Sequence, residues 1–147
     1  MKPVISREAE GDCVYFTVRW SRLTLADKYR IVTGVPSVAG IYELYSMDEK
    51  KKLNLFHVAS VWFGGLRNEL RARTDPELEQ DPVRRRILEE RDCYYRYSLI
   101  ENSDDMADIL FFFDRTYFPG NEPRFQPSGR YVHIHVKELS DDKIVTI

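Results

Sequence analysis

Residues 40–60, GIYELYSMDEKKKLNLFHVAS, carry the clearest structural pattern of this chain. Residues 40–45 have the composition of a β-strand, residues 48–52 are a charged turn, and residues 53–60 have strand composition again. Two strands joined by so short a connection pair most easily with each other. The stretch therefore predicts an antiparallel β-hairpin.

The segment before the hairpin predicts one strand and one short helix. Residues 13–20 alternate strictly between apolar and other side chains, which indicates a strand with one buried face. Thr24 and Asp27 have the spacing of a capping box, so a short helix is expected over residues 25–31, ending near Gly34.

The segment after the hairpin predicts three helices, a strand and a second hairpin. Helices are expected over residues 66–73, 82–91 and 104–117, the last with Ser103 as its N-cap. A strand is expected over residues 94–100, and a closing hairpin over residues 131–138 and 143–147. In the last helix the residues expected to face the core are Met106, Ile109, Leu110 and Phe113.

This order of elements predicts an α+β fold, a small and mostly antiparallel sheet flanked by helices, with an extra N-terminal strand and a C-terminal hairpin. A chain of 147 residues has the usual size of one domain, so a single domain is expected over residues 1–147.

The composition excludes several classes of protein. With 43% hydrophobic and 31% charged residues, the chain is neither disordered nor collagen-like. Its longest purely apolar run, residues 109–113, is too short to span a bilayer, and its first residues do not resemble a signal peptide, so a cytoplasmic protein is expected. Cys13 and Cys93 lie far apart and are expected to be buried free thiols.

The charge balance limits the choice of partner. The chain has 22 Lys and Arg against 24 Asp and Glu, a net charge of -2. No overall positive field attracts a nucleic-acid backbone, so a nucleic-acid site would have to be a local feature of the surface.

Residues 39–126 resemble a divergent member of the GIY-YIG endonuclease superfamily, with a core at about residues 36–126. Gly40-Ile41-Tyr42 matches the motif of the family's first strand, and His57-Val58-Ala59 stands where the family has Tyr-Ile-Gly. The family's arginine helix corresponds to Leu66-Arg67-Asn68-Glu69-Leu70, so that Glu69 takes the place of the catalytic arginine. Pro123-Arg124-Phe125-Gln126 resembles the ending Pro-Arg-aromatic-Asn, and counting back from it places Asp114 at the family's metal-binding glutamate.

The resemblance implies metal-dependent hydrolysis of DNA or RNA. A metal held by a carboxylate neutralises the phosphate, a cation stabilises the transition state, and a Tyr or His moves the proton of water. With an ordinary pKa near 6.5, a histidine suits that role at neutral pH better than a phenol near 10. The implied catalytic residues are Tyr42, His57, Arg67 and Arg71, the implied nucleic-acid-binding residues are Arg73, Arg124 and Gln126, and the implied ligand for magnesium or manganese is Asp114, with Asp108 as its competitor.

Other interpretations compete with the enzyme. Tyr42 would be a packed cross-strand aromatic, His57 a structural histidine, and the run Arg84-Arg85-Arg86 a salt-bridged solvent face. In that case the chain is a noncatalytic protein-interaction module of α+β fold. A small-molecule hydrolase using Cys93 or a serine has no supporting motif. The test is geometric: in an enzyme, Tyr42, His57, one of the arginines 67, 71 and 73, and Asp114 or Asp108 converge on one patch.

Overall fold

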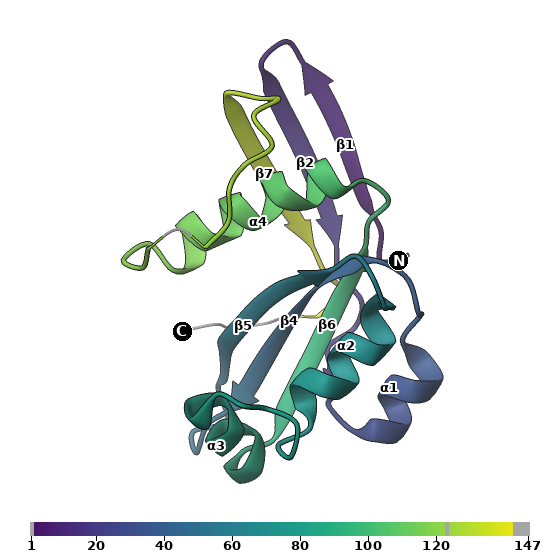
Figure 1. Ribbon diagram of the computed structural model, residues 1–147, viewed down its shortest axis with the longest axis vertical. Coiled ribbons are helices and arrows are strands. Elements are labelled where there is room, and N and C mark those ends of the chain that lie inside the picture. The colour runs from purple at the N-terminus through teal and green to yellow at the C-terminus, as the bar shows by residue number, and fades with distance from the viewer. Residues whose placement is uncertain (1, 123, 143–147) are drawn as a thin grey trace.

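The computed structural model describes residues 2–122 and 124–142, and it has an α+β fold, which confirms the predicted fold class. The elements lie in two sheets with four helices around them (Figure 1). In chain order they are β1 (Ile5–Glu10), β2 (Cys13–Arg19), β3 (Thr24–Leu25), α1 (Lys28–Gly34), β4 (Gly40–Met47), β5 (Leu53–Val61), α2 (Gly65–Thr74), α3 (Pro82–Glu90), β6 (Cys93–Leu99), α4 (Ser103–Tyr117) and β7 (His133–Leu139).

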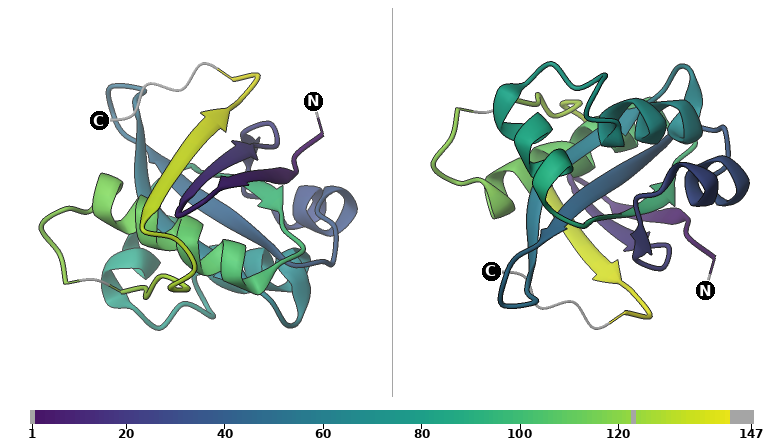
Figure 2. Two further views of the ribbon diagram at one scale, coloured as in Figure 1. Left: turned by 90° about the horizontal axis from the view of Figure 1, so that it is seen from above. Right: turned by 90° about the horizontal axis from the view of Figure 1, so that it is seen from below.

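The predicted hairpin forms the middle of the larger sheet, whose strand order is β3-β6-β4-β5. β4 pairs antiparallel with both β5 and β6, and all but its last residue are buried. The smaller sheet has the order β1-β2-β7, and its strands cross those of the larger sheet (Figure 2). Among the strands that the structure describes, β5 is an edge strand of the larger sheet, and none of them covers its outer edge.

Two hydrophobic cores cover the two faces of the larger sheet. One core joins β2 and α4 to Ile41 and Val58 of the hairpin. The other joins α1 and α2 to Tyr42, Leu44 and Tyr95. Because apolar residues of β4 go to both faces, that strand has almost no exposed surface. In the part of the chain that the structure describes, no helix is long and apolar enough to cross a membrane.

Several predicted elements are confirmed with small shifts. Residues 13–19 form a strand with alternating burial, and the apolar face predicted for the last helix is buried. The helix predicted over residues 25–31 begins instead at Lys28, because Asp27 is its N-cap and Thr24 belongs to a short strand. Asn102, not Ser103, caps α4, accepting hydrogen bonds from the amides of Asp104 and Asp105.

Three features of the fold differ from the sequence expectation. β1 was not predicted, because only its first residue is even partly buried and it lacks an apolar face. β7 pairs parallel with β2, a long-range contact that a local pattern does not reveal. α3 has the predicted position, but it fully buries none of its residues, all of which are described, and its apolar residue Val83 is 68% exposed. Residues 143–147, predicted as the second strand of the closing hairpin, lie outside the described residues.

Candidate functional site

Tyr42, His57 and Glu69 meet at the edge of the larger sheet. The Tyr42 hydroxyl donates a hydrogen bond to Glu69 Oε2 at 2.6 Å, and His57 Nε2 lies 3.2 Å from the same hydroxyl oxygen. The three side chains come from β4, β5 and α2. The structure therefore brings together the two hairpin residues that the sequence singled out and the carboxylate that follows them on the next helix.

The strand register explains how Tyr42 and His57 meet. Tyr42 lies opposite Ala59, and His57 lies opposite Leu44, so the two rings occupy one face of the hairpin two positions apart. Their centroids are 5.6 Å apart. The small side chain of Ala59 leaves room beside Tyr42 for the imidazole.

Gly40 allows α2 to approach this face closely. A Cβ at Gly40 would lie 2.5 Å from Leu66 Cδ1 and 2.6 Å from the carbonyl oxygen of Ser98, so no other residue fits without movement. Leu66 and Leu70 of α2 are buried against the sheet. Glu69 and Arg73, one turn apart, therefore lie on the side of the helix toward Tyr42 and His57.

The hydrogen bonds determine where the protons lie. The Tyr42 hydroxyl gives its one proton to Glu69, so its oxygen accepts from His57 and Nε2 of the imidazole must hold a hydrogen. His57 Nδ1 is then an acceptor, and it is buried without a hydrogen-bond partner in the described part of the chain.

Burial and charge shift both pKa values away from neutral. Burial, together with the hydrogen bond to Glu69, raises the pKa of Tyr42 well above its ordinary value of 10.0. Burial, together with the positive charges of Arg84, Arg124 and Arg73, lowers the pKa of His57 from 6.5 to about 4. At neutral pH the tyrosine is protonated and the histidine is uncharged.

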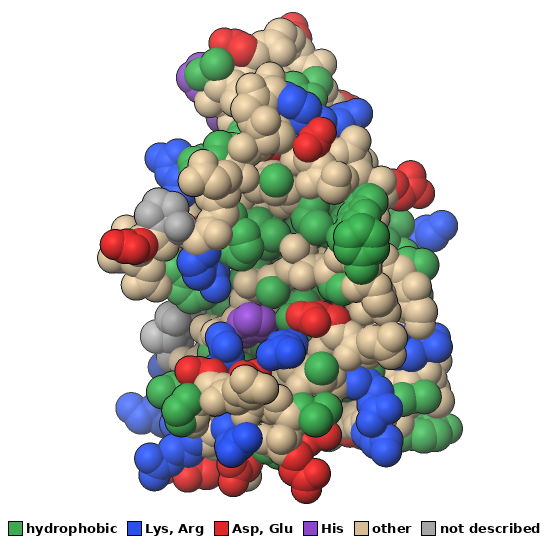
Figure 3. Space-filling view, viewed as in Figure 1, with side chains coloured by type: hydrophobic (Ala, Val, Ile, Leu, Met, Phe, Trp, Pro, Cys, Tyr) green, Lys and Arg blue, Asp and Glu red, His purple; other side chains and the backbone are tan. Residues whose placement is uncertain are grey.

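Three arginines from different elements act on His57. Arg73 belongs to α2, Arg84 to α3, and Arg124 to the segment after α4. Arg73 Nη1 and Arg84 Nε each lie 3.6 Å from Glu79 Oε2, and Arg73 Nε lies 3.9 Å from Glu69 Oε2. Figure 3 shows a histidine in the middle of this face of the molecule, with basic side chains directly beneath it.

Arg67 and Arg71, predicted as catalytic, lie away from Tyr42. Arg67 Nε donates to the carbonyl oxygen of Val35 at 2.8 Å, at the C-terminal end of α1. Arg71 lines a cavity of about 190 Å³ together with residues of α1. The placement of both arginines follows from the helical period. Positions 67 and 71 lie on the side of α2 that faces α1, whereas position 73 faces the sheet edge. Gln126, predicted to bind nucleic acid, is exposed.

Asp114 reaches the cluster only through Arg124. Its Oδ1 accepts from Arg124 Nε at 2.9 Å and its Oδ2 from the Arg124 amide at 3.1 Å, while its own side chain is 4% exposed. The guanidinium of Arg124 also lies over the rings of Phe118 and Phe125, at 5.2 and 5.0 Å. Asp114 thus fixes the direction of an arginine whose charge acts on His57.

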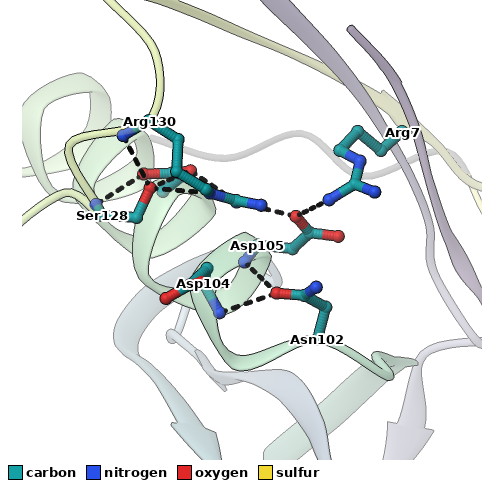
Figure 4. Close-up of polar contacts among 7 residues, drawn as sticks. Arg7, Asn102, Asp104, Asp105, Ser128 and Arg130 are labelled. Carbon is teal, nitrogen blue, oxygen red and sulfur yellow. Dashed lines mark hydrogen bonds and ion pairs between the residues drawn. The ribbon is translucent and has the colours of Figure 1, made fainter.

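Asp108, the competing metal candidate, lies in a separate polar network. Its carboxylate accepts from the amide and hydroxyl of Ser128 at 2.7 and 2.8 Å and pairs with Arg130 at 2.9 Å. Arg130 also pairs with Asp105, which binds Arg7 of β1 (Figure 4). This network attaches the segment before β7 to α4.

Asp114 and Asp108, the carboxylates that the resemblance offers to a metal ion, already bind groups of the protein. Both oxygens of Asp114 and both oxygens of Asp108 already accept hydrogen bonds from the protein. Within residues 2–122 and 124–142, no group of three His, Cys, Asp or Glu side chains is arranged to hold a metal ion. A requirement for magnesium or manganese stays a prediction from the resemblance.

Sequence reasoning did not assign Arg84 and Glu79 to the site. The run Arg84-Arg85-Arg86 predicts a solvated face, and Arg85 and Arg86 do bind locally, to the carbonyl oxygen of Glu79 and to Glu90. The only signal was the sequence position of Glu79, five residues before Arg84 in a connection between helices. A local pattern does not reveal that this glutamate is 2% exposed.

Comparisons with known proteins identify the family of the chain. No curated protein and no solved structure matches it. One family model, described as "Uncharacterised protein", matches residues 4–147. The match covers nearly the whole chain, so the chain belongs to this family of uncharacterised proteins.

Proposed function

We propose that this chain binds DNA or RNA at the cluster of Tyr42, His57, Glu69 and Arg73 and hydrolyses a phosphodiester bond there, as a GIY-YIG-like nuclease. The observation that supports the proposal is the meeting of these four side chains from β4, β5 and α2. Two of them belong to the segments that resemble the family's two strand motifs. The proposed location is the cytoplasm, as expected from the sequence.

The cluster offers a path for the proton of the attacking water. As water attacks the phosphorus, its proton passes to the Tyr42 oxygen while the Tyr42 proton passes to Glu69 Oε2, 2.6 Å away. The bond from phosphorus to the leaving oxygen breaks, and that oxygen takes a proton from solvent. His57, uncharged and hydrogen-bonded to Tyr42, holds the phenol in place, and Arg73 stabilises the charge that develops on the phosphate.

The proposal is tested by cleavage of labelled single- and double-stranded DNA and RNA, in EDTA and with magnesium or manganese. Tyr42→Phe removes the hydroxyl that transfers the proton, and we expect it to lower kcat at least about hundredfold. Tyr97→Phe is the matched control, because Tyr97 belongs to the neighbouring strand β6 and its hydroxyl makes a long hydrogen bond of 3.4 Å to the Gly34 carbonyl oxygen. Cleavage that Tyr42→Phe and Tyr97→Phe reduce equally, or no cleavage by folded wild type, rejects the nuclease.

A noncatalytic protein-interaction module is the second candidate. The observation in its favour is the pair Trp62 and Phe63 in the loop before α2, which are 40% and 88% exposed. Large exposed aromatic side chains next to each other are typical of contact surfaces. This function becomes the better proposal if the folded wild-type protein neither binds nor cleaves any of the nucleic acids tested.

A further inference from the structure

Most of the buried polar atoms without a hydrogen bond lie in one place. Five side-chain atoms in the described part of the chain are buried without such a partner, and four of them surround the candidate site: His57 Nδ1, Arg73 Nε, Glu79 Oε2 and Arg84 Nε. Buried polar groups in proteins are nearly always hydrogen-bonded. Their concentration around one point indicates a site whose groups are arranged for a different partner.

Glu79 lies in the middle of these atoms. Its Oε2 is 3.6 Å from Arg73 Nη1 and 3.6 Å from Arg84 Nε, too far for the short hydrogen bonds that a paired arginine and carboxylate usually form. Its backbone and its other oxygen are held firmly. The amide of Glu79 donates to the Asp75 carbonyl oxygen, and Oε1 accepts from the Asp81 amide at 3.1 Å.

A phosphate group fits this arrangement better than the carboxylate does. A carboxylate has two oxygens in one plane, whereas a phosphate has tetrahedral oxygens that can bind two guanidinium groups on different sides at once. Arg124, held in position by Asp114, adds a third positive charge near His57. When Glu79 leaves, Glu69 is the carboxylate that remains closest to Arg73, at 3.9 Å.

We propose that the space between Arg73 and Arg84 is a phosphate-binding site, and that the carboxylate of Glu79 occupies it as an internal phosphate mimic until a ligand displaces it. This inference rests on the proposed function, because the phosphate is taken to belong to a nucleic acid. The displacement of Glu79 also explains how substrate reaches Tyr42. That side chain is 0% exposed, so an opening must form before a substrate can contact it.

The segment that must move is weakly held by apolar contacts. Glu79 lies in the connection between α2 and α3, and α3, described in full, fully buries none of its residues. Displacing the connection together with α3 exposes the partly buried Ile87 and Leu88 but no fully buried residue of that helix, so it costs less hydrophobic free energy than moving a helix of the core.

The test compares Glu79→Gln with wild type. Glutamine keeps the size of the side chain and an oxygen for the Asp81 amide, but it removes the charge that competes with phosphate. We expect Glu79→Gln to bind both inorganic phosphate and a short oligonucleotide at least about tenfold more tightly, measured by calorimetry at fixed ionic strength. Glu90→Gln is the matched control, because it changes the net charge equally and removes an exposed partner of Arg86 on α3.

Each outcome distinguishes the inference from the proposed function. If Glu79→Gln binds phosphate no more tightly than Glu90→Gln does, the inference is wrong, whatever happens with the oligonucleotide. If phosphate binding tightens but no variant binds the oligonucleotide, the phosphate site is supported and the nucleic-acid function is rejected. If Glu79→Gln does not fold, Arg84→Gln replaces it: phosphate binding must weaken at least about tenfold there and persist in Arg86→Gln.

Discussion

Among the residues of the candidate site, His57 has the pKa that responds most directly to the burial and charge around it. Its imidazole is half-buried, and Arg84, Arg124 and Arg73 all repel a proton on it. Burial and positive charge act in the same direction on a histidine, because both disfavour the charged form. The carboxylate of Glu79 opposes that repulsion, so a phosphate that displaces it raises the pKa of His57 only to the extent that its negative charge exceeds that of the carboxylate.

We predict that the pKa of His57 is lowered. A proton NMR titration should give a value of about 4, against an ordinary value of 6.5. Since the unfolded chain takes up the proton at higher pH than the folded chain does, the free energy of unfolding should fall as pH decreases from about 6.5 to about 4, by about 3 kcal/mol. His57→Asn should remove this part of the pH dependence, and a His57 pKa near 6.5 in the wild type would contradict the described environment.

The start of α2 is the feature that matters most among the elements, because it positions Glu69 and Arg73. The chain turns from β5 into α2 through Gly64 and Gly65, which have φ values of 86° and 80°. Only Gly65 is also crowded: a Cβ there would lie 2.7 Å from the carbonyl carbon of Ser37, whereas a Cβ at Gly64 meets nothing within 4 Å.

Alanine at these two glycines should therefore have different effects. Gly64→Ala places an alanine in a left-handed backbone conformation, which should lower the free energy of unfolding by about 1 kcal/mol. Gly65→Ala adds a clash with the backbone of Ser37 and should lower it by about 3 kcal/mol or more. Urea unfolding of both variants measures the difference. Equal losses of stability would mean that α2 does not pack on the segment at Ser37 as closely as described.

At the scale of the whole molecule, α4 joins the two sheets and the segment before β7. Its apolar face packs on β2 and on the hairpin, and its acidic residues Asp105 and Asp108 bind Arg130. Asp108 is 0% exposed, so Arg130 and Ser128 stabilise its carboxylate in place of water. The parallel pairing of β7 with β2 follows directly after this segment.

Neutralising Asp108 should therefore weaken the whole fold. Asp108→Asn removes one of the two carboxylates that Arg130 pairs with and leaves Asp105 as the other, and we expect a loss of about 2 kcal/mol in the free energy of unfolding. Asp104→Asn, at an exposed position in the first turn of the same helix, should cost about 0.5 kcal/mol or less. Chemical denaturation of both variants is the measurement, and similar losses would show that the network of Figure 4 is unimportant for stability.

Local patterns in the sequence are enough to predict the hairpin at residues 40–60, the helix that contains Leu66 and Leu70, and the α+β class. The sequence also indicates Tyr42 and His57, because each lies in a short motif-like segment of one of the two predicted hairpin strands. Only the tertiary structure decided that Arg73 faces Tyr42 while Arg67 faces α1, that Asp114 binds Arg124, and that Glu79 is buried between two arginines. The physical reason is that periodicity specifies which residues share a face of one element, whereas the partner of that face depends on packing between segments far apart in the chain.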